Sequence, residues 1–132
     1  MEDALEAYLA RRRDVRLALL FGSRVRGDAR PDSDVDVAVR FDAGTDRGGL
    51  AHPRFEVAAD LTGLCGRTVD VVDLATAPPA LAFAIAGEGR LLFEKSEGLC
   101  VEFRAGAYDR YFDTAPLRRV RERYLLEDIL GR

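Results

Sequence analysis

Residues 22–39, GSRVRGDARPDSDVDVAV, decide the fold that we expect for this chain. They follow the apolar run VRLALLF at 15–21, which is typical of a short buried strand. The strand is expected to stop at Gly22 and Ser23, because the polar, glycine- and proline-containing stretch after them favours a turn, a short helix and a loop. A Gly-Ser turn after a buried strand exposes backbone N–H groups, which predicts a cradle for phosphate oxygens.

A second strand is predicted at 33–41, SDVDVAVRF, because polar and apolar residues alternate along it. Side chains two residues apart point to the same face of a strand, so Asp34 and Asp36 share one face with Ala38. The valines between them share the other face. We therefore expect one face to be core and the other to be a site.

The remaining elements are predicted from apolar periodicity and from glycine and proline signals. They are a helix within the first thirteen residues, a helix from Phe55 to Leu64, a strand at 68–74, a helix opened by Pro78 and Pro79, an edge strand at 90–94, and a helical tail from 96 that Pro116 divides. This order predicts an α/β (α+β) fold with a mixed β-sheet flanked by helices. We expect a single domain with a core at 1–95 that contains the candidate site and a helical tail at 96–132 that packs on the core.

Composition excludes several classes of protein. Hydrophobic residues make up 48% and charged residues 33% of the 132 residues, which is typical of a globular domain. The net charge of −3 gives no basic field for a polyanion, so direct nucleic-acid binding is not expected, and the arginine runs at 11–13 and 118–123 are interpreted as solvated helix faces. No signal peptide or membrane span is recognisable, which favours a cytoplasmic protein. Two cysteines and one histidine are too few for a zinc site.

The paired aspartates are the strongest indication of chemistry. Asp34 and Asp36 project from the same face of one strand, so both can bind one divalent cation or bridge two. Their oxygen ligands suit Mg²⁺, and Mn²⁺ would satisfy the same carboxylates. Alone, such a pair is weak evidence, because acidic alternation is common on solvent-facing strands. Because the aspartate pair follows Gly22 and Ser23, the sequence combines a phosphate-binding turn with a metal site, and nucleotidyl transfer requires both.

In residue type and order, GSRVRGDARPDSDVDVAV resembles the nucleotidyltransferase superfamily of the DNA polymerase β type, and most closely its minimal nucleotidyltransferases (MNT). The family pattern is Gly-Ser, about ten residues, then Asp-x-Asp, and here residues 24–33 separate the two parts. The resemblance implies a palm-like fold and a third catalytic carboxylate on a later strand. Asp70 is the first choice and Asp73 the second; their strand parity is opposite, so only one can face the metals. Asp70 would act on the acceptor hydroxyl as a base or by aligning it on the metal.

Two arginines follow the Gly-Ser turn. Arg24 is a candidate nucleotide-binding residue that offsets charge on the triphosphate, and a solvent-exposed loop arginine is the equal alternative. Arg26 is interpreted as solvent-exposed. Gly27 is expected to serve the backbone by adopting a positive φ.

The resemblance also implies a reaction and a partner: transfer of AMP from ATP to a HEPN-domain toxin, with this chain as the antitoxin. Few residues follow the last predicted strand, so we expect the acceptor to be bound with help from elsewhere. Five aromatic side chains in an arginine-rich tail would suit a partner surface or simply pack the tail on the sheet: Phe103, Tyr108, Tyr111, Phe112 and Tyr124. Two alternatives remain, a transferase for a small-molecule acceptor and a non-catalytic antitoxin that binds its partner directly. Three clustered carboxylates cost free energy through mutual repulsion and desolvation, which argues against a non-catalytic antitoxin.

Overall fold

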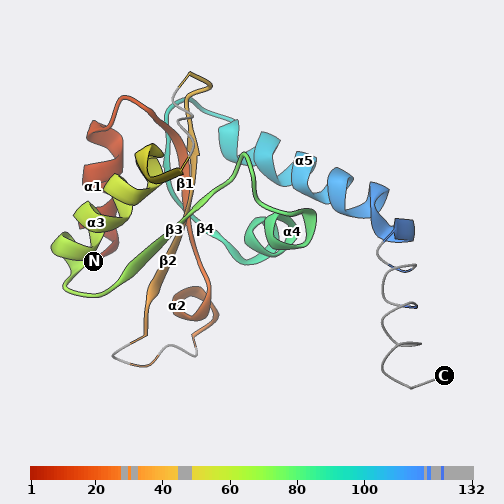
Figure 1. The fold of residues 1–132 in the computed structure, drawn as a ribbon, viewed down its shortest axis with the longest axis horizontal. Helices are drawn as coiled ribbons and strands as arrows, with labels where there is room; N and C mark the ends of the chain where they lie inside the picture. Colours follow the sequence, from red (N-terminus) through yellow and green to blue (C-terminus); the bar gives the residue numbers. More distant parts are fainter. Residues whose placement is uncertain (28–29, 31–32, 45–48, 118, 120–122, 124–132) are drawn as a thin grey trace.

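The computed structural model describes residues 1–27, 30, 33–44, 49–117, 119 and 123. Its elements in chain order are α1 (Glu2–Arg11), β1 (Val15–Phe21), α2 (Ser23–Arg26), β2 (Val35–Phe41), the 3-10 turn η1 (Gly49–Ala51), α3 (Pro53–Cys65), β3 (Val69–Asp73), α4 (Pro79–Glu88), β4 (Arg90–Glu94) and α5 (Leu99–Asp113). Figure 1 shows the strands at the centre of the molecule, with α2 beside one end of the sheet.

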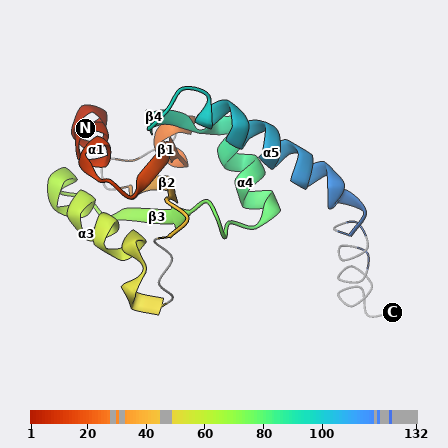
Figure 2. The same cartoon turned by 90° about the horizontal axis from the view of Figure 1, so that it is seen from above.

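The four strands form one mixed sheet in the order β3-β2-β1-β4. β1 pairs antiparallel with both β2 and β4, whereas β2 and β3 run parallel. The helices cover both faces: α1 and α3 lie on one side of the sheet, and α4 and α5 lie on the other (Figure 2). This arrangement confirms the predicted α+β fold with a mixed, helix-flanked sheet.

Two cores, one on each face, hold the sheet in place. The valines of β2 at 35, 37 and 39 are fully buried against α1 and α3, as their alternation predicts. The expectation that the opposite face of β2 is only a site is wrong, because Ala38 is also fully buried, under α4 and α5. On this face of β2, Asp36 near the start and Arg40 near the end are partly buried, and Ala38 between them is covered.

Helix α3 begins and ends as expected but presents different residues to the core. Pro53 occupies its first turn, and Gly66 ends it with a φ of 68°. Val57 and Leu61 are its fully buried apolar residues, whereas Phe55 and Leu64, which belonged to the predicted apolar stripe, are 41% and 55% exposed. The apolar residues of this segment fit more than one helical spacing, so the sequence alone allows more than one apolar face for α3.

The C-terminal tail is helical where it is described. Helix α5 packs against α4 and the sheet through Cys100, Phe103 and Ala107. It ends at Asp113 with Thr114 as its C-cap, and residues 115–117 are helical again, so the predicted division occurs slightly earlier than Pro116. Tyr124 lies outside the described residues. Among the residues that are described, no helix is long and apolar enough to span a bilayer.

The N-terminal arginine run is not simply a solvated face. The Arg12 guanidinium donates to both carboxylate oxygens of Asp14, at 2.9 and 2.8 Å, to Glu56 at 3.0 Å and to the Tyr8 hydroxyl at 3.1 Å. The hydrogen bond to Asp14 is the main reason that the pKa of Arg12 lies above its ordinary value. Arg12 therefore joins α1 to α3 and the start of β1, and the interpretation of this residue as solvated is wrong.

Candidate active site

The Gly-Ser turn lies against the first carboxylate of β2. Gly22 follows β1 with a φ of 86° and a ψ of −156°, a conformation that residues with a side chain rarely adopt. A Cβ at this position would be 2.3 Å from Oδ2 of Asp36. Only glycine allows this approach, because the end of β1 and the start of β2 are neighbours in the sheet, with Phe21 opposite Asp36.

Asp36 and Asp70 are placed side by side by the parallel pairing of β2 and β3, in which they are register partners. Register partners on neighbouring strands point to the same face, roughly 5 Å apart. Asp36 is partly buried, whereas Asp70 is exposed. Asp34 is exposed and precedes β2, whose first residue, Val35, donates its backbone N–H to Thr68, the residue before β3. The three aspartates predicted from the sequence thus lie at one end of the sheet.

The electrostatics of this end of the sheet favour a cation. Burial raises the pKa of the Asp36 carboxyl group, and the carboxylates of Asp70 and Asp34 raise it further. These like charges make the ionised form costly unless a positive charge lies between them. Arg26 acts in the opposite direction, although the net shift is still upward.

The carboxylates fit a hard divalent cation in donor chemistry. Carboxylate oxygens are the ligands that Mg²⁺ and Mn²⁺ accept, and a cation would offset the repulsion between these like charges. Within the described part of the chain, no three acidic, histidine or cysteine side chains are already gathered at metal-binding distance. Asp34, Asp36 and Asp70 could hold the ion once their side chains turn toward it.

Asp73, the second choice for the third carboxylate, has a structural position. It is buried at the end of β3, where Oδ2 lies 3.0 Å from His52 Nε2 and Oδ1 accepts the Ala75 backbone N–H at 3.0 Å. Nδ1 of His52 accepts the Arg54 N–H, so Nε2 carries the proton that is donated to Asp73. Asp73 and His52 join β3 to the start of α3, on a different side of the strand from Asp70.

Sequence reasoning missed one acidic residue at the site. Oε1 of Glu88, the last residue of α4, accepts the Gly22 backbone N–H at 3.1 Å and lies 3.4 Å from Nη1 of Arg26. Arg26 is solvent-exposed as expected, and the structure adds an ion pair with Glu88 that the sequence did not predict. No motif marks Glu88, which is 66 residues from Gly22 and reaches the turn only because β4 returns beside β1.

Arg24 supports the loop that leads to the aspartates. Its Nη2 donates to the backbone carbonyl of Ser33 at 3.0 Å, next to Asp34. Its Nε is buried and has no hydrogen-bond partner among the described residues. Gly27 ends α2 with a φ of 84°, as expected for a backbone role.

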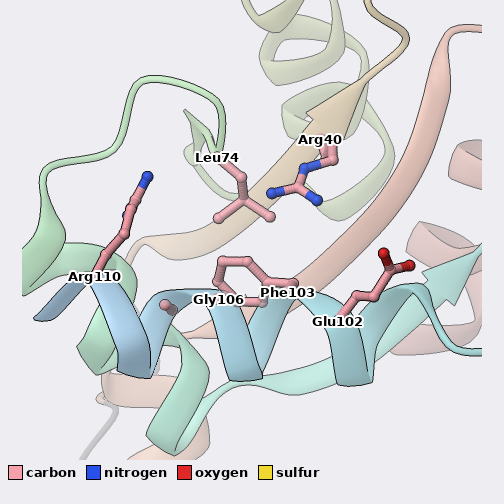
Figure 3. A pocket seen from close by; sticks show the side chains of 7 residues that line it. Arg40, Leu74, Glu102, Phe103, Gly106 and Arg110 are labelled. Carbon is pink, nitrogen blue, oxygen red and sulfur yellow. The ribbon is translucent and has the colours of Figure 1, made fainter. Parts of the chain in front are cut away.

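Asp34 and Asp70 are exposed, and two cavities of the described residues lie away from the aspartates. One cavity of about 200 Å³ lies elsewhere, between α5 and the far ends of β2 and β3 (Figure 3). Arg40 extends over this cavity, 5.8 Å from the centre of the Phe103 ring. A second cavity, of about 350 Å³, lies around His52 and Asp73. Neither cavity is lined by Asp34, Asp36 or Asp70.

Comparison with known proteins agrees with this geometry. The sequence profile of the family described as "Polymerase beta, Nucleotidyltransferase" matches residues 3–98, which include the Gly-Ser turn and all three aspartates. The chain belongs to this nucleotidyltransferase family. It is therefore an enzyme of the nucleotidyltransferase type, built on the fold described above. No curated protein gives a significant match.

Solved structures that are similar to this chain include members of toxin–antitoxin complexes. One, described as a toxin–antitoxin with AMP-PNP, has a TM-score of 0.78 and 23% identity and covers 99% of this chain and 100% of its own. Another, from a complex of a tri-AMPylated Shewanella oneidensis HEPN toxin with an MNT antitoxin, has a TM-score of 0.72 and 21% identity over 99% and 100% of the two chains. A third, identified provisionally as a minimal nucleotidyltransferase, is 36% identical over 67% of this chain and 86% of its own, with a TM-score of 0.54.

Proposed function

We propose that this nucleotidyltransferase is a metal-dependent adenylyltransferase that transfers AMP from ATP to a hydroxyl group of a HEPN-domain partner and so acts as an antitoxin. The observation that carries the proposal is the close approach of Gly22 to the Asp36 carboxylate. This approach joins the turn at Gly22 and Ser23, called the phosphate turn below, and the aspartates into one site. A triphosphate held by this turn would therefore lie next to the carboxylates.

The described residues suit nucleotidyl transfer. Backbone and hydroxyl donors of Gly22 and Ser23 would bind phosphate oxygens, with Arg24 as an additional cationic donor. The acceptor oxygen forms a bond to the α-phosphorus of ATP, the bond from the α-phosphorus to the bridging oxygen breaks, and pyrophosphate leaves. Exposed Asp70 would take the hydroxyl proton or align the hydroxyl. Mg²⁺ held by the three aspartates, or Mn²⁺ in its place, would neutralise the charge on the triphosphate.

The proposed partner class is supported by the similar complexes and by a surface of this chain. Phe83 of α4 stacks on Tyr111 of α5 with ring centres 4.0 Å apart, and both rings meet Phe112 edge-on. Phe112 is 63% exposed, and Leu117 beyond it is 72% exposed. Exposed aromatic and apolar groups of this kind are typical of protein interfaces. We therefore propose a partner-binding role for the tail at 96–132, whose described helix α5 also packs on the core through Cys100, Phe103 and Ala107.

Intact-mass spectrometry of the partner tests this function. The purified chain would be incubated with Mg²⁺, ATP and a HEPN-domain protein of the same genome, sought first in the adjacent reading frame. We expect the partner to gain one or more AMP units, and the chain carrying Asp34→Ala and Asp36→Ala to add none. A Glu94→Gln chain, altered outside the site, serves as the control that keeps activity.

Two outcomes would replace this proposal with one of its alternatives. If the wild-type chain adds no AMP to the partner and the double variant neutralises the toxin equally well, the chain acts by direct binding. If AMP is found only on small hydroxyl compounds, the acceptor is a small molecule.

A further inference from the structure

The phosphate turn already holds an anion in this structure, the side chain of Glu88. Its carboxylate accepts the backbone N–H of Gly22 and lies within ion-pair distance of the Arg26 guanidinium. The Glu88 side chain is 29% exposed, so the contact is made at the edge of the site rather than in bulk solvent. A carboxylate thus occupies part of the turn that we assign to phosphate.

A backbone N–H and a guanidinium are also the donors that bind phosphate oxygens. The N–H of Gly22 has one hydrogen to donate, so it cannot bind the Glu88 carboxylate and a phosphate oxygen at full strength together. Glu88 also adds a negative charge close to Asp36, since it is one of the groups that raise the pKa of that carboxyl group, after burial and the two aspartates. Both effects oppose the binding of a triphosphate.

We propose that Glu88 is an internal competitor for the triphosphate of the nucleotide, which occupies the Gly22 N–H in the empty enzyme and must leave it when the nucleotide binds. This inference rests on the proposed function, because it takes the Gly22 turn as the phosphate site. Glu88 is then a residue that sets the affinity for nucleotide, and it lowers that affinity.

The exchange requires only a side-chain movement. Glu88 is the last residue of α4, and the backbone N–H of the next residue, Gly89, donates to the Ile85 carbonyl oxygen at 2.7 Å, which holds the end of the helix. The helix end therefore stays packed on the sheet while the Glu88 side chain rotates. An incoming phosphate would replace Glu88 as the anion beside Arg26.

Isothermal titration calorimetry with AMP-PNP and Mg²⁺ tests the inference on the full chain. Glu88→Gln removes the charge with little change of shape, and Glu88→Ala removes the contact entirely. Glu94→Gln is the matched control, because Glu94 also accepts a glycine N–H, that of Gly98 at 2.9 Å, but is outside the site. It changes the net charge by the same amount.

We expect Glu88→Gln and Glu88→Ala to lower the Kd for AMP-PNP by about three- to tenfold, the effect of removing one like charge near the phosphates at a partly solvated site. Glu94→Gln should leave the Kd unchanged. If wild type binds AMP-PNP and neither Glu88 variant, folded by its melting curve, binds more tightly, the inference is overturned. If neither wild type nor any variant binds AMP-PNP, the proposed function and the inference both fail.

Discussion

Gly22→Ala should disable the enzyme while leaving it folded, for two reasons visible in the structure. The first is strain: alanine at a φ of 86° and a ψ of −156° costs about 1–3 kcal/mol. The second is contact: the new Cβ would be 2.3 Å from Oδ2 of Asp36 and must keep at least 3.0 Å, so the carboxylate has to move by about 0.7 Å or more. A displacement near 1 Å at a reacting centre costs up to about 100-fold in rate.

Gly66→Ala provides a matched control for the strain. Gly66 also has a positive φ, 68°, but a Cβ there would have no atom within 4 Å, and it ends α3 away from the aspartates. Left-handed alanine costs about 1–2 kcal/mol. Both variants should therefore melt at a lower temperature than wild type, by about 3–5 °C for each kcal/mol in a chain of this length.

Transfer of AMP to the partner and thermal melting would be measured for both variants at equal protein concentration. We expect transfer to fall by about 100-fold in Gly22→Ala and to stay within about threefold of wild type in Gly66→Ala. If Gly22→Ala transfers AMP as fast as Gly66→Ala, the phosphate turn and Asp36 do not form one site, and the reasoning is refuted.

Three further variants separate the roles of the carboxylates. Asp36→Asn should abolish transfer but raise the melting temperature in the absence of metal. Because the pKa of Asp36 is raised in the folded state, its negative charge destabilises the fold above the unfolded-state pKa of about 3.9. The increase in melting temperature should therefore shrink as the pH falls toward 4. Asp70→Asn should lower transfer by at least about 100-fold at unchanged melting temperature, because Asp70 is exposed; a large loss of stability would contradict its place in the site. Asp73→Asn should do the reverse, costing about 1–3 kcal/mol in denaturant melts through the lost hydrogen bond from His52 while transfer continues.

The local rules of the sequence were sufficient for the order of elements and the position of the aspartates. Strand parity predicts that Asp70 and Asp73 lie on opposite faces of β3, and the resemblance to the MNT family favours Asp70 as the site residue. In the structure Asp70 lies beside Asp36, and Asp73 is buried against His52. The positive φ of Gly27 also follows from local reasoning. These features depend on neighbours within a few residues, or on two strands that pair in register.

Features set by tertiary packing could not be predicted in the same way. The alternation along β2 placed Ala38 on the site face, but α4 and α5 cover it. The pattern within β2 cannot predict that helices cover this second face of the sheet. Glu88 reaches Gly22 only through the return of β4 beside β1. The solvated interpretation of Arg12 failed because its three acidic and phenolic partners come from both near and distant parts of the chain.

The central claim is that the chain transfers the nucleotidyl group of ATP, and the position of the transferred label tests it most directly. Parallel reactions with the HEPN partner and Mg²⁺ would contain ATP labelled either at the α-phosphate or at the γ-phosphate. The account predicts that the partner acquires label only from α-labelled ATP, that labelling requires the divalent cation, and that Asp36→Asn abolishes it. Label acquired from the γ-phosphate, or undiminished α-labelling by Asp36→Asn, would contradict the account.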